Sequence, residues 1–219
     1  MKEYPLVSVV VVTYNSSQTI LQTLESVRMQ DYEKIELIIS DDNSSDNTVA
    51  VCEEWINNHS NRFVKSKIIT TSNNTGVTGN VNRGWRSCCG EWVKIFGGDD
   101  LFLPHAISAV MDFVTPEKSI IVSQYNSFTE ENGEKKIGFL HPKPELAAFY
   151  NEENPEVRKK LILHTFIEAT IGYFIRRSVL ESVDGYDERF PMFEDAPMFF
   201  KLTYLGYKFY LLEKPCFLY

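Results

Sequence analysis

Two pairs of adjacent acidic residues, Asp99-Asp100 and Glu194-Asp195, are the side chains of this sequence best suited to do chemistry. The first pair follows an apolar segment and two glycines, which is typical of the end of a strand. Adjacent side chains there point to different sides, so one carboxylate can bind a metal while its neighbour accepts a hydrogen bond from a hydroxyl. Such oxygen ligands suit Mg²⁺ and Mn²⁺. The second pair precedes a predicted helix, whose start holds a carboxylate rigidly.

Each pair also has a purely structural explanation. Asp99 and Asp100 can turn the chain and cap a helix that Pro104 opens at its first position. Asp195 can cap the helix that follows it, with Pro197 in the first turn. The two pairs alone do not decide between a structural role and a catalytic or metal-binding role. The decision depends on the elements around them.

Continuous apolar runs at residues 7–12, 35–40 and 91–96 predict strands that are covered on both faces, as in a parallel sheet. Such strands alternate with helical patterns as far as residue 123. This alternation predicts an α/β fold with parallel strands and right-handed crossovers, and a ligand site beyond the carboxyl ends of the strands. The other elements predicted up to residue 123 are strands at 67–71 and 119–123 and helices at 20–29, 48–57, 80–89 and 104–114.

The pattern changes after residue 123. Residues 130–136 are polar and predict a turn, and the two prolines at 142 and 144 exclude regular helix. We predict no internal repeat. The remaining predicted elements are strands at 169–175 and 208–212 and helices at 155–163, 177–182 and 196–205.

Three polar loops fall at the predicted carboxyl ends of strands: Thr13-Tyr14-Asn15, Asp41-Asp42 and Asp99-Asp100. Neither a dinucleotide-binding glycine motif nor a Walker loop is present, so no glycine loop cradles a pyrophosphate. The loops instead offer other groups to a nucleotide. Tyr14 has an aromatic face for a base, and Thr13 has a hydroxyl. Asp42 can accept from a pyrimidine N–H, Asp99 can accept from a ribose hydroxyl, and Asp100 can bind a cation that bridges two phosphates. They predict a nucleotide-diphosphate site in which a metal supplies the positive charge.

Composition limits the possible classes of protein. The chain has 219 residues, which suits one domain, and its net charge of −8 argues against a nucleic-acid binder. Its 4 cysteines lack the spacing of a zinc site, and we expect reduced thiols and a cytoplasmic location. No apolar run is long enough for a membrane-spanning helix.

Several motifs resemble, in order and spacing, those of the family 2 glycosyltransferases, the inverting enzymes with the GT-A fold. The likeness covers nearly the whole chain but does not identify the sugar. The motifs are residues 7–15 and 38–48, Asn74-Thr75-Gly76, Asn82-Arg83-Gly84, Gly90-Glu91-Trp92, Asp99-Asp100, residues 185–188 and Glu194-Asp195.

The resemblance implies a single GT-A domain over residues 1–219, with a Rossmann-like, mostly parallel sheet. Residues 1–123 would bind the nucleotide sugar and residues 124–219 the acceptor. The implied reaction moves a sugar from a nucleotide-diphosphate sugar, most often a UDP-sugar, to an acceptor hydroxyl with inversion. The implied acceptor is a saccharide or a lipid-linked saccharide, in surface polysaccharide or glycolipid synthesis, with peripheral association at the inner face of the membrane.

The resemblance also implies roles for individual residues. Asp100 would be the direct ligand of Mn²⁺ or Mg²⁺, and Asp195 the general base with Glu194 beside it. The residues implied to bind the nucleotide sugar are Thr13, Tyr14, Asn15, Asp42, Asn74, Gly76 and Asp99.

The sequence departs from the family pattern at several points. Many members carry a further aspartate where this chain has Gly97, an arginine near Val81, and a tryptophan at Ala196. The first departure bears on which oxygens contact the metal, and the others on the choice of donor or acceptor. Members also commonly continue with a Tyr-Arg segment and a histidine that cover the donor. This chain stops at Tyr219, so we expect that lid to be missing from it.

Two other functions remain as alternatives. A sugar-nucleotide pyrophosphorylase on a related fold should have a glycine-rich, basic loop after the first strand, which residues 13–17 do not provide. A non-catalytic domain that binds nucleotide sugars would keep the fold without the reaction.

Overall fold

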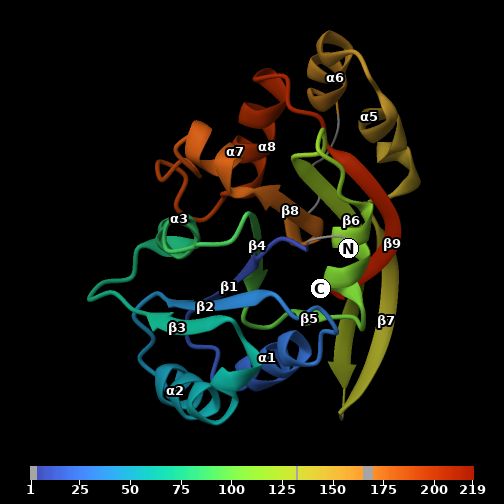
Figure 1. Cartoon of the computed structure of the whole chain (residues 1–219). Helices are drawn as coiled ribbons and strands as arrows, with labels where there is room; N and C mark the ends of the chain where they lie inside the picture. Colours follow the sequence, from blue (N-terminus) through green and yellow to red (C-terminus); the bar gives the residue numbers. More distant parts are fainter. Residues whose placement is uncertain (1–3, 132, 165–169) are drawn as a thin grey trace.

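A curled sheet runs through the centre of the protein (Figure 1). The structure is a computed structural model that describes residues 4–131, 133–164 and 170–219. Its strands lie in the order β3-β2-β1-β4-β8-β6-β9-β5, and β7 pairs with β6. The strands are β1 (Val7–Thr13), β2 (Ile35–Asp41), β3 (Lys65–Ile69), β4 (Trp92–Gly97), β5 (Leu101–Phe102), β6 (Ile120–Glu131), β7 (Glu134–His141), β8 (Tyr173–Arg176) and β9 (Tyr210–Leu218).

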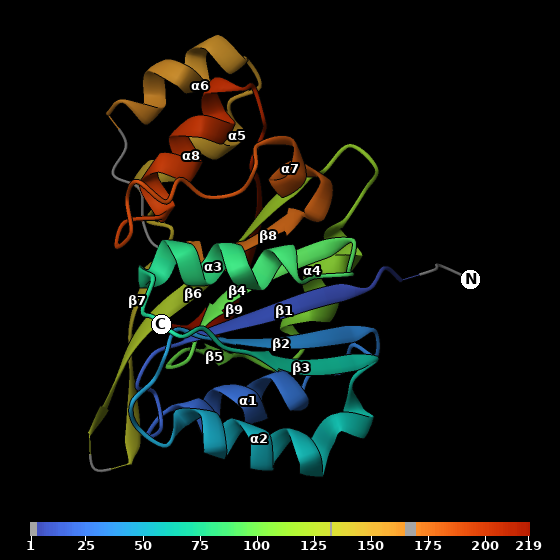
Figure 2. The same cartoon turned by 90° about the vertical axis from the view of Figure 1, so that its left-hand side faces the viewer.

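Helices cover both faces of this sheet (Figure 2). One apolar core joins the sheet to α1, α2 and α4, and a second joins it to α3 and to helices of the second half of the chain. The helices are α1 (Ile20–Arg28), α2 (Thr48–His59), α3 (Gly76–Arg86), α4 (Ala106–Phe113), α5 (Ala147–Asn151), α6 (Pro155–Ile162), α7 (Arg177–Ser182) and α8 (Asp195–Tyr204), with 3₁₀ turns at Ser60–Arg62, Pro144–Leu146 and Thr170–Gly172.

The first four strands are parallel, as predicted from their continuous apolar runs. Val10 at the centre of β1 lies beside Ile38 of β2 and Ile95 of β4, and Val10 and Ile38 are completely buried. Strand β6 keeps the same direction but is separated from β4 by β8, which is antiparallel to both. The mostly parallel sheet is therefore confirmed, with one antiparallel strand inserted at its centre.

Differences from the predicted elements lie mainly after residue 123. Of residues 130–136, predicted as a turn, Gly133 does lie in a turn, but Glu130 and Glu131 belong to β6 and residues 134–136 to β7. Residue 132 lies outside the described residues. Backbone pairing accommodates polar residues on an exposed edge. An ion pair across the two strands supports the pairing of β6 with β7, since the Lys135 ammonium lies 3.0 Å from the Glu130 carboxylate. The last strand extends to Leu218 because its distal part pairs with β6 and β5. The strand predicted at 169–175 occupies 173–176, and Ala169 lies outside the described residues.

Two helices of the first half also start at other residues than predicted. Helix α3 begins at Gly76, so the loop before it is shorter than expected. Helix α4 begins only at Ala106, because His105 at the N-cap position has a φ of 61°, which excludes helical backbone there. Pro104 therefore does not open this helix.

Gly84 allows α3 to pack directly on β1, because a methyl group at this position would collide with Cγ1 of Val10. We expect Gly84→Ala to lower the free energy of unfolding by about 1–3 kcal/mol through overpacking, measured by urea denaturation. Combining it with Val10→Ala should make the loss smaller than the sum of the two single losses, by about 0.5 kcal/mol or more. Additive losses would mean that the two side chains are not in contact.

Candidate active site

A cleft of about 330 Å³ opens at the carboxyl ends of the parallel strands. All four acidic residues of the two pairs line it: Asp99 and Asp100 from the turn after β4, and Glu194 and Asp195 from the start of α8. The fold thus brings together carboxylates that lie in opposite halves of the chain. Among the described residues, no lysine, arginine or histidine lines the cleft.

Helix α8 begins at Asp195, with Glu194 at the N-cap position. Asp195 is therefore in the first turn of the helix, and the structural explanation in which it serves as the cap residue is wrong. The amino-terminal end of a helix carries partial positive charge, which stabilises a carboxylate in this position. Burial and the neighbouring Asp195 raise the pKa of Glu194.

Asp100 is held by the turn that follows β4. The backbone N–H of Gly97 donates to Oδ2 of Asp100 at 3.1 Å, and the residue is only 7% exposed. Burial and the nearby Asp99 raise the pKa of Asp100 to about 7. A Cβ atom on Gly97 would lie 2.7 Å from that Oδ2 and 2.8 Å from Oδ1 of Asp99. The glycine at this position therefore leaves room for both carboxylates.

Lys94 of β4 lies behind the cleft and was not identified from the sequence. It is completely buried, its Nζ donates to the backbone carbonyl of Ile171, and the Nζ lies 4.1 Å from the ring centroid of Phe217. Burial lowers the pKa of Lys94 to about 7, against the attraction of Asp100 and Asp195. The sequence feature that could have pointed to Lys94 is its position as a single lysine in the middle of an otherwise apolar strand. In the structure Lys94 fixes Ile171, which lines the cleft.

The donor set of the cleft fits a divalent cation that also binds phosphate. Within residues 4–131, 133–164 and 170–219, no group of three histidine, cysteine or acidic side chains is arranged to hold a metal by itself. Mg²⁺ commonly uses only one or two carboxylates and takes its remaining ligands from water and substrate phosphates. Asp100, with Asp99 beside it, offers that number of carboxylates.

The loops after β1 and β2 are bonded to one another. Thr13, Tyr14, Asn15 and Asp42 do not line the cleft, whereas Ser16 of the first loop does. Thr13 donates through its hydroxyl to Asp41 at 3.0 Å, and the side-chain oxygen of Asn15 accepts from the backbone N–H of Ser45 at 2.8 Å. Tyr14 is different, since its side chain is exposed to solvent. Thr13 and Asn15 therefore hold the loops in place, and Tyr14 presents a ring to any molecule that binds there.

Asp42 is almost completely buried beneath Thr75 and Arg83. Its Oδ2 accepts from the backbone N–H of Thr75 at 2.9 Å, and its Oδ1 accepts from the Thr75 hydroxyl at 2.7 Å and from Arg83 at 2.8 Å. A carboxylate has about four acceptor positions, so these bonds leave one on Oδ2. Arg83 was quoted in a sequence motif without a role, and the structure places it beside this oxygen pair.

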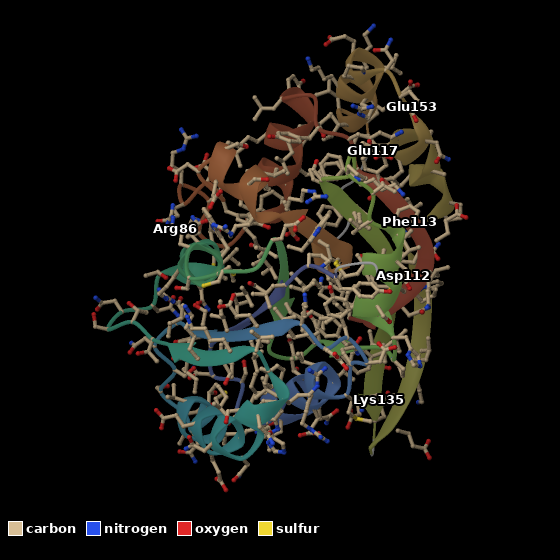
Figure 3. All side chains as sticks on the ribbon, in the orientation of Figure 1. Arg86, Asp112, Phe113, Glu117, Lys135 and Glu153 are labelled. Atoms are coloured by element: carbon tan, nitrogen blue, oxygen red, sulfur yellow. The ribbon has the colours of Figure 1, made fainter. Side chains whose placement is uncertain are left out.

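The loop before Asp195 is fastened to the start of α3. The hydroxyl of Thr78 donates to the carbonyl of Phe190 at 2.5 Å, and its backbone N–H donates to the carbonyl of Pro191 at 3.2 Å. Arg86, on the other end of α3, lies 3.4 Å from Glu188 and is visible between the two halves in Figure 3. These contacts set the position of the Glu194-Asp195 pair relative to the first half of the chain.

Gly76 belongs to this contact rather than to the lining of the cleft. The side-chain oxygen of Asn74 accepts a hydrogen bond from the backbone N–H of Gly76 at 3.0 Å, which holds Gly76 in place. The φ of Gly76 is +78°, and a Cβ atom there would lie 2.6 Å from the carbonyl oxygen of Pro191.

We expect Gly76→Ala to lower both stability and transfer rate, because it displaces the loop that leads to Asp195. Gly133→Ala is the matched control, since Gly133 has a φ of +79° and nothing within 4 Å of a Cβ atom. The control should lose only about 1–2 kcal/mol of stability, which is the cost of a left-handed backbone conformation for a residue with a Cβ atom. It should keep its transfer rate. Urea denaturation and initial rates check both variants. Equal effects of the two substitutions would contradict a role for the Pro191 contact.

Comparison with known proteins decides the family. The model for glycosyl transferase family 2 matches residues 8–183, well over half of the chain. This chain belongs to glycosyl transferase family 2. The resemblance seen in the sequence motifs is thereby confirmed.

One curated relative of this family 2 chain is the Escherichia coli UDP-Glc:alpha-D-GlcNAc-diphosphoundecaprenol beta-1,3-glucosyltransferase WfaP, which is 32% identical over 129 residues. The match covers 58% of this chain and 48% of the relative. The chain therefore spans less than half of that relative's length.

Solved structures confirm the GT-A fold of the family 2 chain. The crystal structure of S. aureus TarS 1-349 in complex with UDP has a TM-score of 0.74 at 22% identity, and the match covers 98% of this chain and 60% of that TarS fragment. The mannosyltransferase PcManGT from Pyrobaculum calidifontis, in complex with GDP-Man and Mn²⁺, has a TM-score of 0.72 at 19% identity and covers 99% of this chain and 57% of that protein. In the part of the family 2 chain that the structure describes, no helix is long and apolar enough to cross a bilayer.

Proposed function

We propose that this protein transfers a sugar from a UDP-sugar to an acceptor hydroxyl, with inversion and with the help of a divalent cation. The observation that carries the proposal is the cleft itself. Asp100 and Asp195 both line it, and the charged side chains that line it within the described part of the chain are all carboxylates.

The charge of this cleft supports dependence on a metal. A diphosphate would be repelled by four carboxylates, and no basic side chain of residues 4–131, 133–164 and 170–219 lines the cleft to attract it. A divalent cation at Asp100, with Asp99 beside it, would supply the positive charge that the diphosphate needs as it leaves. PcManGT, whose structure contains Mn²⁺, is a precedent for such an ion on this fold.

Asp195 is the group proposed to act on the acceptor. As the acceptor hydroxyl attacks the anomeric carbon, Asp195 takes its proton. The bond from that carbon to the diphosphate oxygen breaks on the opposite side, so one displacement inverts the configuration. The transition state has oxocarbenium character, as in glycoside hydrolysis.

The nucleoside is proposed to bind at the loops after β1 and β2. Tyr14 offers its exposed ring for stacking on the base. Asp42 retains one acceptor position on Oδ2 for the N3–H of uracil, and Arg83 beside it is a donor for the adjacent carbonyl of the base. This pairing of an acceptor with a donor matches the N3–H and a carbonyl of uracil. Guanine offers the same pair at N1–H and O6, so the comparison of UDP- and GDP-sugars below distinguishes the two bases.

The acceptor is proposed to be a saccharide or a lipid-linked saccharide in the synthesis of a surface polysaccharide or glycolipid. WfaP, by its name, acts on a diphosphoundecaprenol-linked sugar, which supports this class of acceptor. Such an acceptor would bring the protein to the inner face of the cytoplasmic membrane as a peripheral protein.

A panel of UDP-, GDP- and dTDP-sugars, each with Mn²⁺ and with EDTA, tests the proposal. Thermal shift identifies the donor that binds, because a ligand of the folded state raises the apparent stability. NMR of the product formed from an α-linked donor should then show a β-linkage. Binding without transfer or hydrolysis would favour a non-catalytic domain, and retention of configuration would rule out the proposed role of Asp195.

A further inference from the structure

A second hollow, here called the side pocket, adjoins the cleft and has a volume of about 500 Å³. Asp99, Asp100 and Tyr219 line both hollows, so the two meet at the turn that follows β4. The side pocket is completed by residues near the start of α1, on β5 and on β6: Gln18, Thr19, Gln22, Leu101, Phe128 and Glu130. The sites proposed above for the nucleoside, the cation and the base use none of these residues.

The β6–β7 hairpin is fastened to α1 at the edge of the side pocket. Lys135 of the hairpin (Figure 3) donates to the side-chain oxygen of Gln22 at 2.9 Å and lies 3.0 Å from the carboxylate of Glu130. Residues 22 and 135 are far apart in the sequence, so the fold itself brings them together. The edge of the pocket is therefore held by specific contacts and is not a gap between neighbouring loops.

Two further hydrogen bonds fix the other walls. The Thr19 hydroxyl donates to the carbonyl of Gly98 at 2.8 Å, which joins the start of α1 to the turn that carries both aspartates. The backbone N–H of Phe128 donates to the carbonyl of Tyr219 at 2.9 Å, which joins β6 to the residue that follows β9. The two aromatic residues of the pocket are thus held side by side by their backbones.

The side pocket offers neutral hydrogen-bonding groups beside aromatic rings. Gln18 makes no side-chain hydrogen bond with any residue that the structure describes, and the same holds for the amide nitrogen of Gln22. A carboxamide contains both donors and acceptors. Phe128 is half-buried and Tyr219 is 53% exposed, so each ring has apolar surface that a ligand can cover.

This combination of groups discriminates between classes of ligand. An anion would be repelled by the three carboxylates of the side pocket, and within the described part of the chain no basic side chain lines it. A wholly apolar molecule would remove water from the two glutamines without replacing their hydrogen bonds. A neutral saccharide avoids both costs, because its hydroxyls donate and accept hydrogen bonds and its C–H faces can pack on the two rings.

We infer that the side pocket binds a sugar unit of the acceptor, next to the unit whose hydroxyl receives the transferred sugar. The inference rests on the proposed function, in which the reacting hydroxyl lies at Asp195. Asp195 lines only the cleft, whereas Asp100 and Tyr219 line both hollows. An acceptor of two or more units can therefore extend from the cleft past Tyr219 into the side pocket.

NMR titration with methyl glycosides tests the inference, because the side-chain amides of Gln18 and Gln22 give signals of their own. The probes are the methyl glycosides of glucose, galactose, mannose and N-acetylglucosamine, each with and without UDP and Mn²⁺. We expect at least one of them to shift both signals in a saturable way, and inorganic phosphate without Mn²⁺ to shift neither. The signal of Asn57, an exposed residue of α2 that lines neither hollow, is the internal control and should not move.

Gln22→Ala removes one amide of the side pocket at an exposed position of α1, where alanine favours the helix. The variant should bind the glycoside about 2–10-fold more weakly, the usual effect of losing one hydrogen bond. The Gln18 signal reports this affinity, and titration with UDP and Mn²⁺ shows whether the donor site is intact. Asn57→Ala on α2 is the matched control and should bind the glycoside with unchanged affinity.

The outcomes separate this inference from the proposed function. If UDP binds with Mn²⁺ but no glycoside shifts the two glutamine signals, the proposed function stands and the inference is overturned. If a glycoside shifts them but UDP does not bind, the proposed function is wrong and only the saccharide site is upheld. If a UDP-sugar shifts them and UDP alone does not, the side pocket holds the sugar of the donor, which overturns the inference. An unchanged glycoside affinity in Gln22→Ala also overturns it.

Discussion

Asp195→Asn should lower the rate of sugar transfer by about 10²–10⁴-fold, the usual contribution of a general base. Asparagine keeps the size of the side chain but cannot take the proton of the acceptor hydroxyl. Donor binding should be retained, since the proposed binding site of the diphosphate is at Asp100 and not at Asp195. Initial rates and titration with UDP and Mn²⁺ measure the two properties separately.

Asp184→Asn is the matched control for this substitution. Asp184 also precedes α8, but its side chain is 93% exposed, is paired only loosely with Arg86 at 3.5 Å, and does not line the cleft. This variant should transfer sugar at the normal rate. Normal transfer by Asp195→Asn would remove the assignment of the base.

Asp100→Asn should abolish the metal-dependent part of donor binding. Loss of groups that only orient a metal ligand typically weakens metal binding by about 10–100-fold, so loss of the proposed ligand itself should weaken it at least as much. Titration of UDP in Mn²⁺ and in EDTA measures the effect as the ratio of the two affinities. This ratio should be large for the unaltered protein and close to one for the variant.

Asp112→Asn serves as the control for Asp100→Asn. Asp112, labelled in Figure 3, is an exposed aspartate on α4 that accepts a hydrogen bond from Tyr4 at 3.0 Å and does not line the cleft. Its substitution should leave the Mn²⁺ dependence unchanged. A normal Mn²⁺ dependence in Asp100→Asn would show that the cation binds elsewhere.

The first half of the fold could be predicted from the sequence because its signals are local. Continuous apolar runs such as residues 7–12 identified buried parallel strands, and their carboxyl ends marked the edge where Asp99 and Asp100 lie. The antiparallel strand β8 could not be placed in the same way, because its position depends on pairing with β4 and β6, which are distant in the chain.

For the candidate site, residue types were more informative than the contacts that they make. Both acidic pairs were identified from sequence, but the bonds of Asp42 to Thr75 and Arg83 were not, since they depend on how the loops after β2 and β3 fold together. Lys94 was missed because a single cation within an apolar strand gives no periodic signal. The aliphatic residues that line the cleft were missed for a similar reason, because valines and isoleucines of buried elements are indistinguishable from ordinary core residues until their surroundings are known.

The pairing of β5 with β9 limits how this protein can be recombined with its relatives. Leu101 and Phe102, directly after Asp99 and Asp100, pair with Leu218 and Phe217 near the other end of the chain. A chimera that exchanges only residues 124–219 would therefore also replace the support of the turn that carries both aspartates. Grafting a new acceptor specificity onto this scaffold requires that β9 be kept, or that β5 be redesigned together with it.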